Sequence, residues 1–145
     1  IVVNQPIYNM FQRYIEKEII PLSERSGIGQ VVFSPLAQGL LTGKYRKGRA
    51  IPAGSRAADS RINGFFNRML NDETLDKVEQ LIGVADELGI RLSQLALAWI
   101  LRQPDIASAL IGASRPDQVE ENVKAIDVKL SPDVLERIET ILANG

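Results

Sequence analysis

The sequence has no cysteine and no histidine. The absence of cysteine excludes disulfide bonds, thiolate zinc sites and a cysteine nucleophile. The absence of histidine removes the usual acid–base group at neutral pH and the commonest metal ligand. The charges nearly cancel, with 17 basic and 18 acidic side chains and a net charge of -1, so no overall field favours nucleic acid or an anionic membrane. Any bound anion must therefore be held by local geometry.

No apolar run is long enough to span a bilayer and no signal peptide opens the chain, so we expect a cytoplasmic protein. The 145 residues, of which 45% are hydrophobic and 24% charged, are typical of one globular domain or a large part of one. Ile1-Val2-Val3 has the composition of a buried strand already under way. This start indicates a processed chain or a fragment of a longer one.

Three short aliphatic runs predict strands at residues 1–5, 30–34 and 107–111. They do not alternate with polar residues, as expected for strands of a parallel sheet that is covered on both faces. Apolar residues at helical spacing predict helices over 14–26 (bent or ended at Pro21), 75–88 (ended by Gly89), 92–100 (capped by Ser93), 119–126, and 132–142 (capped by Ser131). Repeated strand–helix units predict an α/β fold with right-handed crossovers. Periodicity alone leaves both an open doubly wound sheet and a slice of a barrel possible.

The segment from Leu36 to Met69 is far longer than an ordinary connection and contains Pro52 and several glycines. Such a length favours a functional loop.

The residues from Phe33 to Tyr45 leave the end of the second predicted strand, where ligands sit in parallel α/β folds. Phe33 can stack on a flat heterocycle, Ser34 can bond a phosphate oxygen, and Lys44 can neutralise one. A buried phenylalanine, a Ser-Pro turn and a solvated lysine explain the same residue types, and on these residues alone that explanation is favoured.

A second segment, from Ile111 to Asn122, runs through a glycine turn into a helix, whose first N–H groups attract phosphate. Arg115 adds a planar cation that suits a phosphate monoester. Gln118, Glu121 and Asn122 share one helix face, which could receive an adenine edge. The alternative is a helix capped by Ser114 with solvated neighbours, and the residues favour neither explanation.

A third segment, Asn4 to Asn9, ends the first predicted strand. A carboxamide at this place can bind another carboxamide reciprocally, although glutamine and asparagine beside a proline usually mean a turn.

Taken in this order, the three segments resemble the aldo-keto reductases, and most of all the bacterial branch that includes the β subunits of voltage-gated potassium channels. The resemblance runs over essentially all 145 residues. It is carried by Ser34-Pro35-Leu36-Ala37 with Gly39 and Gly43-Lys44-Tyr45, and by Gly112-Ala113-Ser114 with Gln118 and Glu121-Asn122. The family fold is an eight-stranded (β/α) TIM barrel that binds NADPH. The resemblance implies that residues 1–145 are the C-terminal part of one such domain, holding about its sixth to eighth strands.

The resemblance also implies roles for individual residues. Gln5 would bond the nicotinamide carboxamide and Phe33 would stack on the nicotinamide ring. Ser34, Leu36 and Gln38 would line the pyrophosphate, with Lys44 and Arg56 closing over it. Gly112, Ser114, Arg115 and Gln118 would surround the 2'-phosphate and its ribose, and Glu121 with Asn122 the adenine. Phe33 departs from the tyrosine or tryptophan that the family more often has, and Gly54 stands where the channel subunits have a tyrosine.

No catalytic residue can be placed, because the family's catalytic aspartate, tyrosine, lysine and histidine all precede the sixth strand. Tyr8, Tyr14 and Tyr45 match no catalytic motif. The resemblance therefore implies an NADPH-dependent oxidoreductase of aldehydes and ketones whose chemistry lies outside this chain, so that the chain alone is inactive. It also implies a missing N-terminal half as partner, because three barrel strands leave two open edges. Two alternatives are a regulatory NADPH-binding subunit and a remnant without activity.

Overall fold

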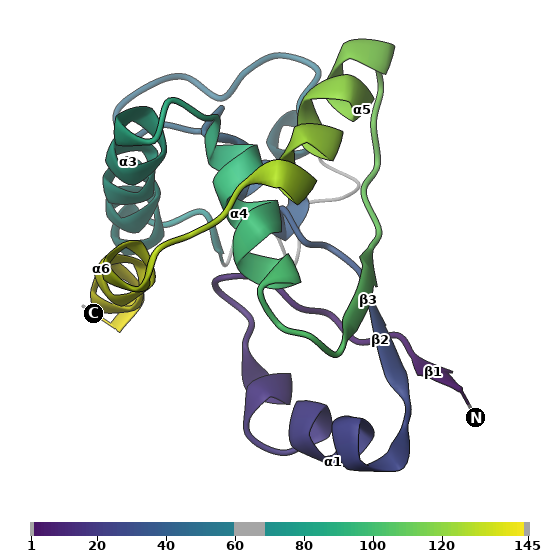
Figure 1. Ribbon diagram of the computed structural model, residues 1–145. Helices are drawn as coiled ribbons and strands as arrows, with labels where there is room; N and C mark the ends of the chain where they lie inside the picture. Colours follow the sequence, from purple (N-terminus) through teal and green to yellow (C-terminus); the bar gives the residue numbers. More distant parts are fainter. Residues whose placement is uncertain (1, 60–68, 144–145) are drawn as a thin grey trace. The chain divides into compact units, whose positions relative to one another are not determined.

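The computed structural model describes residues 2–59 and 69–143 (Figure 1). The chain folds into two compact units. The first, here called the sheet unit, comprises Ile1–Ala37 and Gln94–Leu130. The second, here called the loop unit, comprises Gln38–Ser93 and Ser131–Gly145.

The sheet unit is built on three parallel strands in the order β1-β2-β3 (Figure 1). They are β1 (Val3–Asn4), β2 (Gly29–Val32) and β3 (Ile106–Ala109). Val3 of β1 pairs with Gly29 of β2, and Gln30 of β2 pairs with Ile106 of β3. Three parallel strands at these places confirm the predicted α/β class, although each strand is shorter than predicted and Ile1 lies outside the described residues.

β1 is short because Pro6 interrupts its ladder. Proline has no N–H to donate, so pairing can continue only through its carbonyl. The Phe33 N–H donates to the Pro6 carbonyl at 3.0 Å and the Tyr8 N–H donates to the Phe33 carbonyl at 3.3 Å. The backbone therefore follows β2 beyond the regular strand, and Ile7 forms an isolated parallel bridge with Phe33.

The helix predicted over 14–26, bent or ended at Pro21, is divided in the structure, but before Pro21. The chain forms a 3-10 turn, η1 (Tyr14–Glu16), and then α1 (Ile19–Ser26). Pro21 lies in the first turn of α1, where its missing N–H breaks no intrahelical hydrogen bond. Gly27, at a φ of 66°, ends the helix by donating its N–H to the carbonyls of Ser23 and Glu24.

Helix α4 (Leu92–Leu101) is largely apolar, and its Leu95, Ala96, Trp99 and Ile100 are fully buried. Ser93 lies inside this helix rather than at its N-cap, so the predicted cap is wrong. The first turn begins one residue earlier, at Leu92, which is itself buried.

Helix α5 (Pro116–Val123) continues into the 3-10 turn η4 (Lys124–Asp127). The three apolar residues that mark it in the sequence are exposed in the structure: Val119 by 45%, Val123 by 53% and Ile126 by 63%. Arg115 is the N-cap of α5, without a side-chain hydrogen bond. The alternative in which Ser114 caps this helix is therefore wrong.

In the loop unit, α3 (Asp72–Glu87) and α6 (Pro132–Ala143) pack side by side (Figure 1). The Asn71 side chain caps α3 by accepting the Thr74 N–H at 2.9 Å. Ser131 caps α6 as predicted, accepting the Val134 N–H on its hydroxyl at 3.4 Å. Gly89, at a φ of 67°, follows the end of α3, which confirms the predicted stop.

The predicted long loop contains two 3-10 segments, η2 (Ala37–Thr42) and η3 (Arg56–Ala58). Its residues 60–68 lie outside the part of the chain that the structure describes.

Candidate functional site

Three candidate segments follow the carboxyl ends of the three strands of the sheet unit. Gln5 comes directly after β1, Phe33 after β2, and Gly112 three residues after β3. Because the strands are parallel, these ends meet at one edge of the sheet, where ligands of parallel α/β folds bind. Gln5 is exposed, and 41% of Phe33 is exposed, which is a large fraction for a phenylalanine next to the fully buried Val32. Both side chains are accessible for a flat ligand.

Ser34 is held in a strained backbone conformation directly after Phe33. Its φ is 53°, in the left-handed region that non-glycine residues rarely adopt. The Asn9 side chain donates to the Ser34 carbonyl at 3.0 Å and accepts the N–H groups of Phe11 and Gln12, each at 3.0 Å. Strain of this kind persists where the surrounding structure fixes it, and it is common at ligand sites.

Asn9 is a positioning residue to which the sequence assigned no role. It is completely buried between Tyr8 and Met10, which are buried as well. A polar side chain inside an apolar run is the signal that could have identified it, because a buried amide needs hydrogen-bond partners.

A buried polar network lies beside Asn9. The Tyr8 hydroxyl donates to Glu16 Oε1 at 2.5 Å, and Arg102 donates to the Tyr8 hydroxyl at 3.2 Å and to the Trp99 carbonyl at 2.6 Å. The guanidinium groups of Arg102 and Arg13 lie 3.7 Å and 5.0 Å from the Trp99 ring centroid. The network ties η1 and α4 to the segment that carries Asn9.

The network shifts the ionisation of two of its members. Burial, followed by the hydrogen bond to Glu16, raises the pKa of Tyr8 to about 12. Burial would also raise the pKa of Glu16, but the hydrogen bonds from Arg13 and Tyr8 outweigh it and hold that pKa below its usual value. At neutral pH the network therefore holds a neutral phenol against a carboxylate.

The start of α5 presents an exposed cation. Arg115 donates from Nε and Nη2 to the two carboxylate oxygens of Asp117, at 3.0 and 3.1 Å. This hydrogen-bonded pair and the charge of Asp117 raise the pKa of Arg115. Ser114 donates its N–H at 2.8 Å and its hydroxyl at 3.3 Å to the Gln118 amide oxygen. The structure therefore joins Ser114 to Gln118 and pairs Arg115 with Asp117, and the anion site stays a prediction.

Further along α5, Glu121 is bonded to Lys124 with 2.6 Å between Oε1 and Nζ. The buried Gln94 of α4 donates its amide to the Glu121 carbonyl at 2.8 Å. This carbonyl belongs to the last turn of α5, directly before the chain continues into η4. Gln94 is a second positioning residue that the sequence reasoning missed. The signal is a glutamine in the mostly apolar stretch from Leu92 to Leu101.

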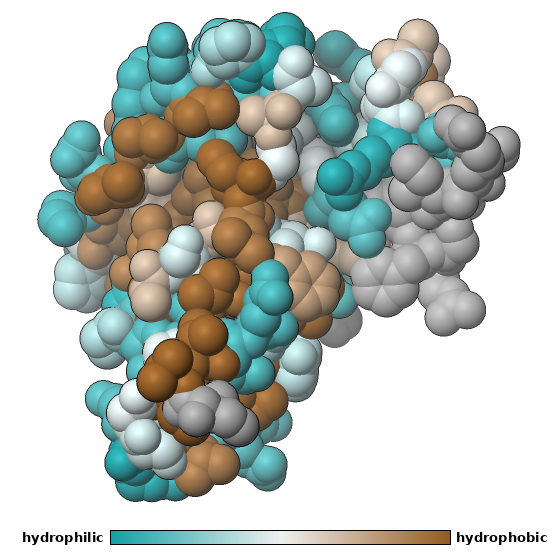
Figure 2. Space-filling model, turned by 90° about the vertical axis from the view of Figure 1, so that its right-hand side faces the viewer, coloured by the Kyte–Doolittle hydropathy of each residue, from teal (hydrophilic) through white to brown (hydrophobic). Residues whose placement is uncertain are grey.

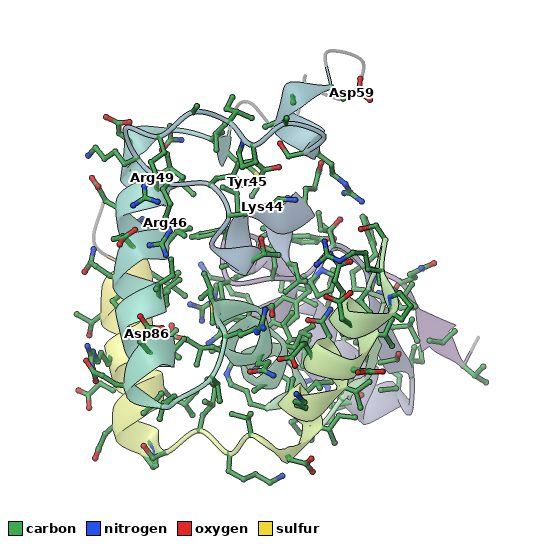
Figure 3. All side chains as sticks on the ribbon, turned by 90° about the horizontal axis from the view of Figure 1, so that it is seen from above. Lys44, Tyr45, Arg46, Arg49, Asp59 and Asp86 are labelled. Atoms are coloured by element: carbon green, nitrogen blue, oxygen red, sulfur yellow. The ribbon has the colours of Figure 1, made fainter. Side chains whose placement is uncertain are left out.

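In the loop unit, Gln38 and Gly39 continue the irregular backbone with φ values of 56° and 104°. A Cβ on Gly39 would lie 2.9 Å from Lys44 Cε and 3.0 Å from its Nζ. Gly39 therefore lets the Lys44 side chain lie across the backbone, with its Nζ 5.1 Å from the Tyr45 ring centroid (Figure 3).

Tyr45 also positions Arg56. The Tyr45 ring is buried and its hydroxyl accepts the Ala57 N–H at 3.4 Å, which joins η3 to the segment that carries Lys44. Arg46 extends towards α3, where it bonds Glu79 at 2.5 Å (Figure 3). The bond between Tyr45 and Ala57 ties the segment that carries Arg56 to the segment that carries Lys44.

Residues 2–59 and 69–143 contain no group of three or more histidine, cysteine or carboxylate side chains that could hold a metal ion. Within the same ranges, none of the helices has the length and apolar character of a membrane span.

A family comparison identifies the fold that these segments belong to. Residues 1–143 match the model of the aldo/keto reductase family. The chain belongs to this family. A probable voltage-gated potassium channel subunit beta of Arabidopsis thaliana is 49% identical over 144 residues, covering 97% of this chain and 44% of the relative. The L-glyceraldehyde 3-phosphate reductase of Escherichia coli K12 is 37% identical over 149 residues, covering all of this chain and 42% of the relative.

A solved family structure agrees with the fold. The glycerol dehydrogenase of Gluconobacter oxydans superposes with a TM-score of 0.78 at 28% identity, covering 97% of this chain and 42% of that chain. The predicted family is therefore confirmed, and the fold of the chain is one that an oxidoreductase family shares. The chain spans less than half the length of these relatives. The individual ligand contacts stay predictions.

Proposed function

We propose that this chain is the cofactor-holding C-terminal part of a single (β/α)8 barrel domain, with β1, β2 and β3 as the sixth, seventh and eighth barrel strands. The protein that carries it reduces aldehydes and ketones to alcohols. NADPH supplies the hydride when it is bound. The residues of this chain bind and orient the cofactor, and the proton donor lies elsewhere in the protein, which we propose to be cytoplasmic.

In the sheet unit, Gln5 bonds the nicotinamide carboxamide and Phe33 stacks on the nicotinamide ring. The exposure of both side chains at the end of adjacent parallel strands supports these roles. Ser34 and Leu36 line the pyrophosphate. Ser34 is held in place for this by Asn9.

At the start of α5, Gly112, Ser114, Arg115 and Gln118 bind the 2'-phosphate and its ribose, and Glu121 with Asn122 binds the adenine. In the loop unit, Gln38 contacts the pyrophosphate, and Lys44 and Arg56 supply positive charge to it. The link from Tyr45 to Ala57 supports a common role for these two cations.

One observation carries the proposal. An accessible aromatic ring, Phe33, is followed directly by Ser34 at a φ of 53°, at the ligand-binding edge of the sheet. Neither exposure of an aromatic ring nor backbone strain favours folding, so their combination supports a binding role.

Two substitutions test the two ends of the cofactor separately in the protein that carries this chain. Phe33→Ala removes stacking on the nicotinamide, so it should weaken NADPH and NADH by the same factor, whereas Phe33→Tyr should preserve both affinities. Arg115→Ala should weaken NADPH by about 10- to 100-fold and leave NADH nearly unchanged. Titration by cofactor fluorescence measures both. Equal losses for NADPH and NADH in Arg115→Ala would remove the 2'-phosphate role.

The missing half of the barrel is proposed as the partner of the sheet unit. Hydrophobic side chains gather on the face that carries β1, β3 and α5 (Figure 2). The exposed hydrophobic residues in or next to these elements include Val2 at 81% exposure, Leu110 at 44% and Val123 at 53%. Among residues 2–59 and 69–143, β1 and β3 each pair with β2 alone, and exposed apolar surface beside their outer edges favours further barrel strands as its cover.

The chain alone should therefore be inactive. Residues 1–145 hold no histidine and no tyrosine at a family catalytic position, so no group is placed to protonate the reduced carbonyl. NADPH oxidation with 4-nitrobenzaldehyde should stay at background for these residues alone and appear when an N-terminal half is supplied. Turnover by the purified chain would show that the active site has been misplaced.

A regulatory NADPH-binding subunit is the second candidate. It is supported by the identity of 49% to the Arabidopsis thaliana protein, compared with 37% to the Escherichia coli reductase. Tight NADPH binding without turnover of any aldehyde, in the protein that carries this chain, would favour this candidate.

A further inference from the structure

Arg115, which is proposed to bind the 2'-phosphate, is already paired with the carboxylate of Asp117. Arg115 Nε and Nη2 donate in parallel to Asp117 Oδ1 and Oδ2, at 3.0 and 3.1 Å. Parallel double hydrogen bonding is also how a guanidinium binds a phosphate group. The carboxylate of Asp117 therefore occupies donors that a phosphate would use.

We propose that Asp117 is a built-in counter-ion which competes with the cofactor's 2'-phosphate for Arg115, and so limits the preference of the protein for NADPH over NADH. This inference rests on the proposed function of the Arg115 site. It assigns a specificity-determining role to a residue that does not itself bind the cofactor.

Charge makes the competition unfavourable to the phosphate. A phosphate monoester carries a charge of about -1.5 to -2 at neutral pH, and it must approach beside the negative carboxylate or displace it from Arg115. Asp117 lies in the first turn of α5, where the helix dipole favours an anion. The Asp117 carboxylate therefore interacts favourably both with the Arg115 guanidinium and with the dipole at the N-terminus of α5.

Gln118 also occupies donors of the site but differs from Asp117 in charge. Its amide oxygen accepts both the N–H and the hydroxyl of Ser114, so it also occupies donors of the site. The amide is neutral, however, and its displacement leaves no like charge beside the phosphate. Of the two occupants, only Asp117 opposes a 2'-phosphate more strongly than a 2'-hydroxyl.

The effect is limited by solvent. The side chains of Arg115 and Asp117 are 65% and 62% exposed, so salt screens their interaction. Exposed ion pairs of this kind typically change an equilibrium by up to about fivefold. Removal of the Asp117 charge should therefore increase the affinity for NADPH about two- to fivefold and leave the affinity for NADH unchanged.

The test uses the protein that carries this chain, with Asp117→Asn and Asp117→Ala as variants. Glu120→Gln is the matched control, since Glu120 is an exposed carboxylate on the same helix. Dissociation constants are measured by titration for NADPH, NADH and adenosine 2',5'-bisphosphate, at about 0.05 M and about 0.5 M salt. Both Asp117 variants should bind NADPH and the bisphosphate more tightly than the wild type, and the gain should shrink at high salt. NADH should be unaffected.

Three results would overturn the inference: unchanged or weaker NADPH binding in both Asp117 variants, an equal gain for NADH, or an equal gain in Glu120→Gln. The last would mean that overall charge, and not the Arg115 pair, is responsible. A failure of the proposed function looks different, because the wild-type protein would then bind neither NADPH nor NADH. That result would also refute the proposed role of Asp117.

Discussion

Tyr8→Phe is the substitution for which the structure gives the clearest magnitude. It removes one hydroxyl from a completely buried side chain and keeps the ring, whose centroid is 5.4 Å from that of Trp99. The lost hydrogen bond runs to the ionised Glu16 at 2.5 Å. Hydrogen bonds to charged groups contribute about 1.5–3 kcal/mol, so we expect the free energy of unfolding to fall by about that amount at neutral pH.

The pH dependence provides an independent check. The pKa of Tyr8 is raised from 10.0 to about 12 in the folded protein. A raised pKa means that the stabilisation is fully present below pH 10 and is lost as the pH rises towards 12, because the unfolded tyrosine ionises first. A shift of this size corresponds to roughly 3 kcal/mol. The difference in stability between wild type and Tyr8→Phe should therefore shrink through this range.

Urea unfolding of the protein that carries this chain, followed by circular dichroism from neutral to alkaline pH, measures both quantities. Tyr14→Phe is the control, because Tyr14 is 59% exposed and should give a change below about 0.5 kcal/mol. A loss in Tyr8→Phe no larger than in Tyr14→Phe, or a difference that does not change with pH, would refute the reasoning.

Four further predictions concern residues that position the site. Glu16→Gln should destabilise the protein at neutral pH but not in acid. The lowered pKa of Glu16 means that its carboxylate stabilises the fold above the usual glutamate pKa, and this stabilisation disappears as Glu16 is protonated. Unfolding measured at neutral and at acid pH gives the difference. Asn9→Ala should weaken the binding of NADPH and NADH alike, because it removes the hydrogen bond that holds the Ser34 carbonyl in place. Unchanged affinities in titrations of both cofactors would disprove this. Gln94→Leu should weaken NADPH by loosening α5, whereas Gln80→Leu on an exposed face of α3 should not, as cofactor titration can show. Gly39→Ala should destabilise by about 1–3 kcal/mol in thermal unfolding, because a φ of 104° strains any residue with a Cβ, and by more than Gly48→Ala, whose φ of 70° lies nearer the left-handed region and whose Cβ would have open space.

The sequence by itself determined the family, the α/β class and the order of the elements. The class and the order follow from hydrophobic periodicity, glycine stops and the Ser131 cap, which act within a few residues of each other, whereas the family follows from the resemblance of the motifs. The sequence also selected the segments after the strands, since two separate motifs with the right spacing are rarely matched by chance. The break between η1 and α1 was not determined, because the position of Pro21 within a first turn depends on where that turn begins.

Tertiary structure alone decided which polar residues support the site. Asn9 reaches Ser34 across 25 positions and Gln94 reaches Glu121 across 27, and no local pattern encodes such pairs. The left-handed backbone at Ser34 and Ala37 was likewise invisible, because neither residue type favours it. The Arg115–Asp117 pair lies within three residues, yet only the geometry shows the carboxylate on the same two donors that a phosphate would use.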